Sequence, residues 1–199
     1  MTRDNVFVHA SSYVDEPCTI GAGTRIWHFS HVMKDCEIGE GCNIGQNVVI
    51  SPGARIGRNV KIQNNVSVYT GVTLEDDVFC GPSMVFTNVV TPRAHVRRND
   101  PDKDYAPTRV GRGATLGANC TIVCGHAIGA YAFVAAGAVV TRDVPDHALV
   151  MGNPARQRGW ACACGAKLVA GGPETWSCPE CSACYAMGPG GLVRQEVQL

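Results

Sequence analysis

The aliphatic residues of this chain recur every six positions, a spacing that neither an α-helix nor an ordinary β-strand produces. Ile56, Ile62 and Val68 are six apart, and the same spacing covers residues 8–86 and, after an interruption, residues 110–140. A helix would require a period of 3.6 and a half-buried strand a period of two. Because the period of six persists over fourteen consecutive hexads, the chain is predicted to form a coiled solenoid.

The fifth place of each hexad is small or β-branched nearly throughout. Residues at this place include Ser12, Cys18, Thr24, Ser30, Cys36, Cys42, Val48, Ala54, Ala114, Cys120, Ala132 and Ala138. We interpret the pattern as a prism of short parallel strands, in which one aliphatic residue per hexad fills the interior and the small residues permit the corners. Three hexads would close one coil, and each coil would be stabilised by its neighbours about 4.8 Å above and below.

The length and charge of the chain limit its function classes. With 199 residues and 45% apolar content, it can bury one substantial core and carry a small appendage. Lysine plus arginine balance aspartate plus glutamate at 17 each, so no overall positive field would gather nucleic acid or an anionic membrane. The first residues lack a secretory signal, and no stretch approaches the roughly 20 apolar residues of a membrane span. We expect a soluble cytoplasmic protein.

One segment, expected to be a loop over residues 91–109, interrupts the six-residue pattern. It contains prolines and many charges, and Val110 resumes the pattern 24 residues after Phe86. Removing one coil of eighteen residues therefore leaves the repeat in phase, as if the extra chain left the prism at one corner. Loops of this length are usually functional or disordered.

Residues eighteen apart should lie in one column of the prism. His28 and Asn64 share a column, which could be solvated polar surface or a ligand-binding groove. With the loop removed, Asn88 and Arg142 share another column, about two coils or roughly 10 Å apart. His28 should lie more than three coils from Asn88, roughly 16 Å away, so it could hold only the far end of an extended ligand.

The cysteines fall into two groups. Six lie within the repeat, where a thiol acts as a compact hydrophobe: Cys18, Cys36, Cys42, Cys80, Cys120 and Cys124. The other five follow residue 160, with CxCG and then CPxC in the spacing of a small zinc ribbon. The predicted zinc ligands are Cys162, Cys164, Cys178 and Cys181, with Cys184 as a spare or substitute. The first pair is one residue shorter than the usual CxxC, so a ribbon that has lost its metal is the alternative.

The strings "QNNVSVY", "GPSMVFTN" and "GNPARQRGW" give the chain a specific resemblance. Over residues 5–160 it resembles the hexapeptide-repeat nucleotide-sugar 3-N-acetyltransferases. The resemblance implies an all-β, left-handed parallel β-helix, a homotrimer with active sites between adjacent prisms, and a loop that covers the site of a neighbouring subunit. It also implies acetyl-CoA as co-substrate.

The expected reaction is acetyl transfer from acetyl-CoA to the 3-amino group of a nucleotide-linked sugar in surface polysaccharide biosynthesis, such as that of lipopolysaccharide. UDP-2-acetamido-3-amino-2,3-dideoxyglucuronate is the favoured substrate, and a dTDP-3-amino-3,6-dideoxyhexose is the alternative. An amine on such a ring should titrate near or below about 8, so much of it is already neutral and a dedicated base is dispensable. Positioning and one polar group could supply most of the rate.

The resemblance also assigns roles to residues of this chain. Asn88 is the candidate catalytic residue that holds the amine or the thioester, although Glu75 or Asp76 could instead serve as a base. The sugar would be surrounded by Gln63, Asn64, Tyr69 and Glu75, and the nucleotide end would face Arg25 and His28. CoA would run along the later coils, beside Gly125 and Ala136, with its phosphates near Arg142 and Arg156.

Two other classes compete with an acetyltransferase. A γ-type carbonic anhydrase shares the prism, but it needs three histidines that converge on zinc, and His28 with His31 does not supply that set. The other is a non-catalytic β-helix scaffold whose zinc ribbon binds a partner. We divide the chain into a β-helix domain over residues 1–159, a zinc-ribbon-like module over 160–186 and a tail over 187–199.

Overall fold

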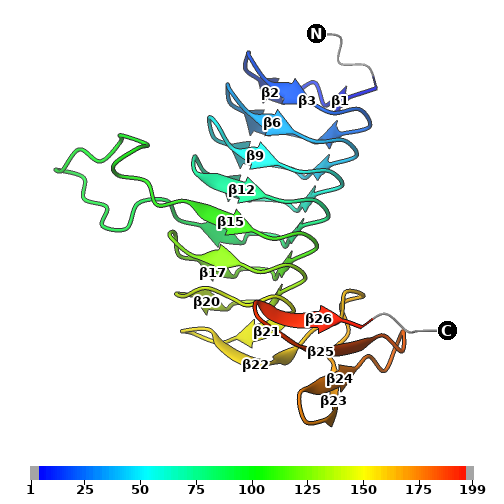
Figure 1. The fold of residues 1–199 in the computed structure, drawn as a ribbon. Helices are drawn as coiled ribbons and strands as arrows, with labels where there is room; N and C mark the ends of the chain where they lie inside the picture. The colour runs from blue at the N-terminus through cyan, green and yellow to red at the C-terminus, as the bar shows by residue number, and fades with distance from the viewer. Residues whose placement is uncertain (1–4, 196–199) are drawn as a thin grey trace.

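A computed structural model, which describes residues 5–195, contains a parallel β-solenoid of stacked triangular coils and a small C-terminal module (Figure 1). Three sheets form the faces of the prism. Sheet A contains β1 (Phe7–Val8), β4 (Arg25–Ile26), β7 (Asn43–Ile44), β10 (Lys61–Ile62), β13 (Phe79–Cys80), β16 (Thr115–Leu116), β19 (Phe133–Val134), β21 (Ala148–Met151) and β22 (Arg156–Trp160). All neighbours in this sheet are parallel except β22, which returns antiparallel to β21.

The two other faces are built in the same way. Sheet B contains β2 (Tyr13–Val14), β5 (His31–Val32), β8 (Val49–Ile50), β11 (Ser67–Val68), β14 (Val85–Phe86), β17 (Thr121–Ile122) and β20 (Val139–Val140). Sheet C contains β3 (Thr19–Ile20), β6 (Glu37–Ile38), β9 (Arg55–Ile56), β12 (Val72–Leu74), β15 (Thr108–Val110) and β18 (Ala127–Ile128). We name the edges between faces the A–B, B–C and C–A corners.

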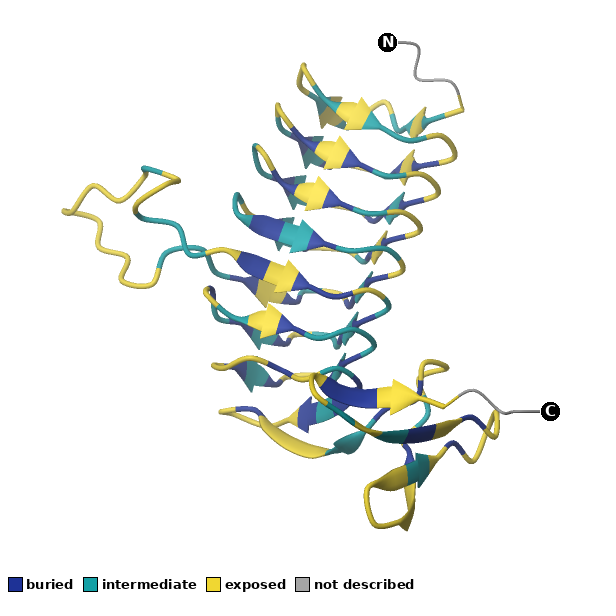
Figure 2. Cartoon of the chain, viewed as in Figure 1, coloured by how far each residue is buried: buried dark blue, intermediate teal, exposed yellow. Residues whose placement is uncertain are grey.

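The six-residue period is confirmed as the period of one strand and one corner. Ile26, Ile44 and Ile62 pair in consecutive coils of sheet A and are fully buried. Figure 2 shows that in most strands of the prism beyond the first coil a buried residue follows an exposed or half-buried one. At many corners the chain turns through a residue with positive φ, such as Asn47 at 56° and Asn65 at 60°, a conformation that asparagine tolerates better than most residues.

The preference for small residues at the fifth place of the hexad has a physical cause that could not be seen from the sequence. In the first coils, where this place is Ser, Thr or Cys, the short side chain donates to a carbonyl fifteen residues later, in the next coil. The Thr24 hydroxyl donates to the Gly39 carbonyl at 2.9 Å, and the Cys42 thiol donates to the Gly57 carbonyl at 3.1 Å. The cysteines of the repeat are thus packed as predicted. Burial, the main cause, raises the pKa of the Cys36 thiol to about 11.

The chain leaves the prism at the B–C corner after β14 and returns at β15. Val110 of β15 pairs with Leu74 of β12, 36 residues earlier, so eighteen residues beyond one coil have left the prism, as the phase of the repeat predicted. Residues 87–107, which we call the ejected loop, project far from the coils (Figure 1). The loop was expected over 91–109, but Thr108 pairs with Val72, so β15 already begins there.

The C-terminal module forms its own antiparallel sheet beside the last coils. Its strands are β23 (Val169–Gly172), β24 (Thr175–Ser177), β25 (Cys184–Gly188) and β26 (Gly191–Arg194). We call residues 161–195 the cysteine module. Because β26 pairs with β25, this sheet continues past the division expected at residue 186; residues 196–199 of the expected tail lie outside the described residues. Among residues 5–195, no helix is long and apolar enough to cross a membrane.

Candidate active site and candidate metal centre

Several predicted site residues lie at the A–B corner. His28 and Asn64 share one exposed column: the Asn47 amide donates to the His28 carbonyl at 2.9 Å, and the Asn64 Oδ1 atom accepts from the Gln46 amide at 2.9 Å. The His28 ring stacks on His9 with 3.5 Å between ring centroids. The polar column predicted from the spacing therefore exists. Gln63 and Ala136, further along the prism, belong to the same corner region, and Ala136 is exposed.

A second group lies at the B–C corner, where the ejected loop begins. Asn88 is half-buried, and its carbonyl accepts the Ala106 amide at 2.9 Å as the loop returns. In the coil beyond, the Gly125 amide donates to the Pro107 carbonyl at 3.0 Å. Tyr69 and Arg142 are exposed at the same corner. The two corners flank sheet B, so the predicted site is divided between two edges of a single prism.

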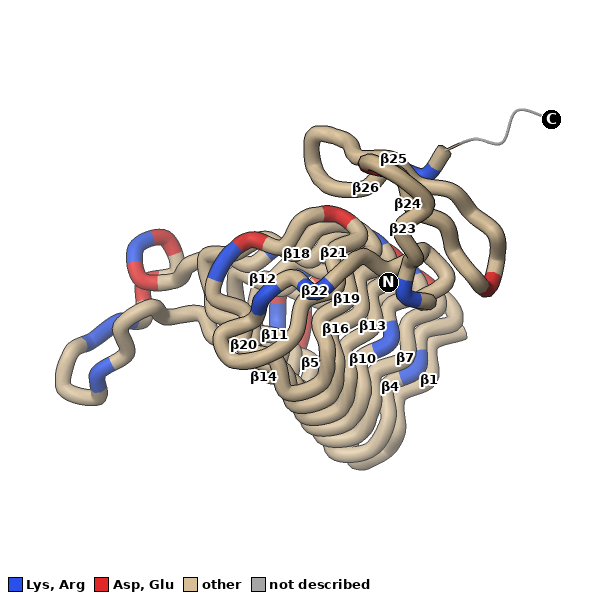
Figure 3. The backbone as a smooth tube through the Cα atoms, turned by 90° about the horizontal axis from the view of Figure 1, so that it is seen from below, with Lys and Arg blue, Asp and Glu red and all other residues tan. Residues whose placement is uncertain are grey.

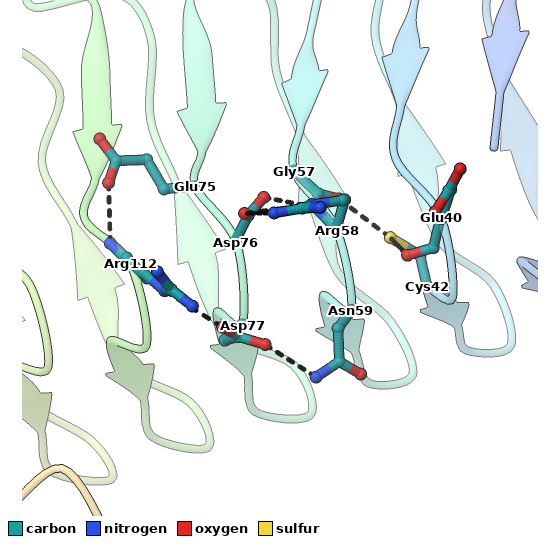
Figure 4. A network of polar contacts seen from close by, with 9 residues as sticks. All are labelled: Glu40, Cys42, Gly57, Arg58, Asn59, Glu75, Asp76, Asp77 and Arg112. Carbon is teal, nitrogen blue, oxygen red and sulfur yellow. Dashed lines mark hydrogen bonds and ion pairs between the residues drawn. The ribbon is translucent and has the colours of Figure 1, made fainter.

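Glu75 lies elsewhere, at the C–A corner (Figure 4). Its Oε1 atom accepts from Arg109 Nε at 2.7 Å, and its Oε2 atom accepts from the Arg112 amide at 3.0 Å. The structure therefore does not bring Glu75 together with Gln63, Asn64 or Tyr69 within one chain. Its role in binding the sugar stays a prediction.

Asp76, the alternative base, is held in the same network. It accepts from the Arg58 amide at 2.7 Å and from the Arg58 guanidinium at 3.0 Å. The backbone bond to Arg58, followed by the guanidinium itself, keeps the pKa of the Asp76 carboxyl below its usual value. A carboxylate stabilised in its ionised form is a weak proton acceptor.

The remaining predicted contacts lie on sheet A. Arg25 lines a hollow of about 500 Å³ near the start of the solenoid, together with Asn5, Phe7 and Trp27. Arg156 begins β22 at the opposite end of the prism, where it is exposed and donates to the Ala155 carbonyl at 2.9 Å. These two arginines therefore belong to opposite ends of the same sheet.

The arginines among residues 5–195 fall into two sets, those that form an ion pair with a carboxylate and those that do not. On sheet C and the C–A corner, arginines pair with carboxylates: Arg55 with Glu37 at 3.2 Å and Arg58 with Asp76 at 3.0 Å are examples. Among residues 5–195, no carboxylate lies within ion-pair distance of the following arginines: Arg25, Arg93, Arg97, Arg98, Arg142, Arg156, Arg158 and Arg194. The second set can neutralise an anionic ligand without losing an internal partner.

Three of these unpaired arginines lie together in the ejected loop, and none of them is among the site residues predicted from the sequence. Arg93, Arg97 and Arg98 line one hollow of about 510 Å³ in the ejected loop. The loop's acidic residues follow them, where Asp100 pairs with Lys103 at 3.1 Å. The available signal was a segment, residues 91–98, with three arginines and no acid in a chain that is otherwise neutral.

The four predicted zinc ligands come together in the cysteine module. Their sulfur atoms all lie within 4.8 Å of one another, with Cys162 and Cys181 at 3.5 Å and Cys164 and Cys178 at 3.6 Å. A zinc ion with four sulfurs at about 2.3 Å in tetrahedral geometry would separate them by about 3.8 Å, so the donor set fits. Cys184 is outside this group, and its thiol donates to the Ser182 carbonyl.

Cys162 is the cysteine of the group that ionises most readily. Burial opposes its ionisation, but hydrogen bonds from the Tyr185 hydroxyl, the Cys164 backbone and neighbouring thiols lower its pKa to about 6. Cys164 and Cys181 resist ionisation. A hydrogen bond with the Ala183 backbone lowers the pKa of Cys181, but hydrogen bonds with Cys162 and Cys178 raise it above its usual value, and the pKa of Cys164 is also raised. In the absence of a metal, ionisation of one thiol therefore opposes ionisation of its neighbours. A bound divalent cation would remove this opposition, because it stabilises several thiolates at once.

Comparisons with known proteins agree with the fold. The family "Bacterial transferase hexapeptide (six repeats)" matches residues 17–52, and "Hexapeptide repeat of succinyl-transferase" matches residues 37–70 and 107–142. GDP-perosamine N-acetyltransferase from Caulobacter crescentus, solved with CoA and GDP-perosamine, has a TM-score of 0.55 at 24% identity, over 79% of this chain and 58% of that one. The acetyltransferase domain of PglB from Neisseria gonorrhoeae, solved with acetyl coenzyme A, has a TM-score of 0.51 at 21% identity, over 78% and 58%.

One relative is much more similar in sequence. The chain is 46% identical over 167 residues to dTDP-3-amino-3,6-dideoxy-alpha-D-galactopyranose 3-N-acetyltransferase from Aneurinibacillus thermoaerophilus, with 84% of each chain covered. The region of identity is long enough to include the prism and the ejected loop. The chain belongs to the hexapeptide-repeat nucleotide-sugar N-acetyltransferases, which are acetyl-CoA-dependent enzymes.

Proposed function

We propose that the enzyme acetylates the 3-amino group of a dTDP-linked 3-amino-3,6-dideoxyhexose. The observation that carries this choice is the 46% identity to an enzyme named for such a substrate. From the sequence alone, a UDP-linked glucuronate was the favoured substrate and the dTDP sugar the alternative; the identity to this relative supports the alternative. A product used in surface polysaccharide, such as lipopolysaccharide, remains part of the proposal.

The chemistry requires little beyond positioning. The neutral sugar amine attacks the thioester carbonyl, a tetrahedral oxyanion forms, and CoA leaves as the thiol. Asn88, beside the loop exit, would hold the amine or the thioester in place. Among the other predicted contacts, Gln63, Asn64 and Tyr69 would surround the sugar. The nucleotide end would meet Arg25 and His28.

CoA would bind along the later coils. Its pantetheine arm would run beside Gly125 and Ala136, and its phosphates would meet Arg142 and Arg156. The lack of internal ion pairs at these two arginines supports this proposal, because a phosphate would not have to displace a carboxylate.

We further propose a homotrimer whose sites lie between adjacent prisms. The predicted site residues occupy two corners that flank sheet B. One active site would therefore combine the A–B corner of one chain with the B–C corner of the next. In this arrangement the ejected loop would reach an adjacent chain, and its unpaired arginines would contact a phosphate of the nucleotide sugar or of CoA.

The cysteine module is proposed to hold one structural zinc ion through Cys162, Cys164, Cys178 and Cys181. The convergence of the four sulfur atoms supports this site. Loss of the metal should unfold the module and leave the prism folded, because the two have separate apolar cores.

The function is tested by incubating the protein with acetyl-CoA and each of the two candidate nucleotide sugars, and following release of free thiol. We expect turnover with the dTDP-3-amino-3,6-dideoxyhexose and at least tenfold lower kcat/KM with the UDP-glucuronate. The reverse preference would instead identify the UDP-linked glucuronate as the substrate. If no nucleotide-linked amino sugar causes thiol release, the alternative of a non-catalytic β-helix scaffold would be favoured.

Two substitutions locate the reacting centre. Asn88→Ala should lower kcat by about two powers of ten with little change in KM for the nucleotide sugar, because one polar contact in the transition state is lost. His28→Ala should raise that KM and change kcat less. An inactive His28 variant beside a fully active Asn88 variant would contradict this assignment.

A further inference from the structure

A buried histidine joins the prism to the cysteine module. His147 lies in the last C–A corner, between Val144 and β21, and only 6% of its surface is exposed. Its ring stacks on Tyr131 of the prism at 5.1 Å and meets Tyr185 of the module edge-on at 4.9 Å. The two tyrosines therefore enclose the same imidazole from the two parts of the chain.

Tyr185 connects this stack to the cysteine cluster. The Ala163 amide donates to the Tyr185 hydroxyl oxygen at 3.0 Å, so the hydroxyl proton is free to donate to the Cys162 sulfur at 3.1 Å. Tyr185 is almost fully buried, with 1% exposed. A hydrogen bond of this kind orients a metal ligand and stabilises its thiolate.

Strand β22 leads directly into the same contacts. After β22, Ala161 donates its amide to the His147 carbonyl at 2.7 Å, and its own carbonyl contacts His147 Nδ1 at 2.9 Å. Ala161 precedes the ligand Cys162 in sequence. Trp160, the last residue of β22, packs against both the prism core and the core of the module. Arg156 begins this strand.

We propose that the metal-loaded cysteine module fixes β22 on the last coil, with Tyr185 and His147 as positioning residues that connect the metal ligand Cys162 to the prism. The occupant of the cluster would be a thiophilic divalent cation such as zinc. This inference rests on the metal site and on the role of Arg156 proposed above. It adds that the module positions the strand that carries a CoA contact, rather than being an independent appendage.

The test compares the full-length protein with and without zinc by hydrogen–deuterium exchange and by chelator competition. Removing zinc should increase amide exchange in residues 148–160. Tyr185→Phe keeps the ring but loses the hydroxyl, and should weaken zinc binding about tenfold or more. It should also increase exchange in β22 and raise KM for acetyl-CoA more than it lowers kcat. Cys184→Ser, in the same module but outside the cluster, is the matched control and should change none of these.

A second variant separates the contact with the prism from the metal site. Tyr131→Leu removes the prism side of the stack, so it should increase exchange in β22 while zinc affinity stays unchanged. Protein that binds no zinc would overturn both the metal site and this inference. Zinc that binds normally, with exchange in residues 148–160 the same in the loaded and zinc-free protein, would overturn the inference alone. Tyr185→Phe with unchanged zinc affinity would exclude the role given to the hydroxyl.

Discussion

Single side chains at the corners differ in whether their polar atoms are satisfied. Thr24 is fully buried, and its hydroxyl both donates to the Gly39 carbonyl and accepts from the Cys42 amide. Thr108 is equally buried, but its hydroxyl is the one buried side-chain polar atom without a partner in the part of the chain that the structure describes. Two threonines in similar surroundings therefore make opposite contributions to the free energy of folding.

Thr108→Val should stabilise the protein by about 1 kcal/mol, because the substitution removes an unsatisfied hydroxyl without changing the volume. Val72 already occupies the paired position one coil away. Thr24→Val should instead destabilise by about 1–3 kcal/mol, since it leaves the Gly39 carbonyl and the Cys42 amide without their partner. Chemical denaturation of both variants decides the matter, and a shift of the same sign in both would contradict the argument.

The period of six predicted which residues share a column, but it could not predict every partner. The stacking of His28, Gln46 and Asn64 follows directly from the eighteen-residue coil. Glu75 differs, because its partner Arg109 is 34 positions away, across the ejected loop. The contact between Tyr185 and Cys162 was also invisible, since nothing in the local pattern shows how the module folds onto the prism.

The coil is the repeating element of the molecule, and the ejected loop is an addition to one corner. Removing eighteen residues, 89–106, would join Asn88 to Pro107 and restore a coil of normal length. Pro107 would then stand where Gly71 and Gly125 have φ values of 90° and 84°, which proline cannot adopt, so Pro107→Gly must accompany the deletion.

This shortened variant should keep the circular dichroism spectrum and the melting temperature of the prism and lose acetyl transfer. The physical reason is that the prism core is built by the coils, whereas the loop carries the arginines proposed to bind phosphate. Circular dichroism, thermal melts and the thiol-release assay measure these properties. A variant that fails to fold would show that the loop is required for the solenoid, and a fully active one would exclude the loop from the site.

Within residues 5–195, the arginines with carboxylate partners and those without them occupy different parts of the molecule. Viewed along the prism in Figure 3, the ejected loop extends from one corner and the cysteine module lies at another. Two of the ion pairs in this region, Arg55 with Glu37 and Arg112 with Asp77, join exposed side chains, and such pairs contribute little to stability in water. The phosphate-binding role proposed above is therefore given to the arginines that have no such partner.

Replacing Arg93, Arg97 and Arg98 together by glutamine should therefore raise KM about tenfold or more for one phosphate-bearing substrate, since charge-assisted contacts are lost. Measuring KM separately for acetyl-CoA and for the nucleotide sugar identifies which phosphate the loop contacts. Arg55→Gln, which removes an exposed and paired arginine, is the control and should leave both constants unchanged. Unchanged constants in the triple variant would show that the loop arginines are only solvated.

The ejected loop adds the length of one whole coil at a single corner, and this has a consequence for how such enzymes diversify. The ends of the ejected loop are adjacent at one corner, where the Ala106 amide meets the Asn88 carbonyl. Doubling the length of a flexible loop adds only about 0.6 kcal/mol of closure entropy. Insertions and deletions at this corner therefore leave the stacking energy of the prism almost unchanged. The loop can therefore change in length and sequence while the prism stays under a separate constraint, and a peptide tag or fluorescent reporter inserted at the loop tip should leave the prism folded for the same reason.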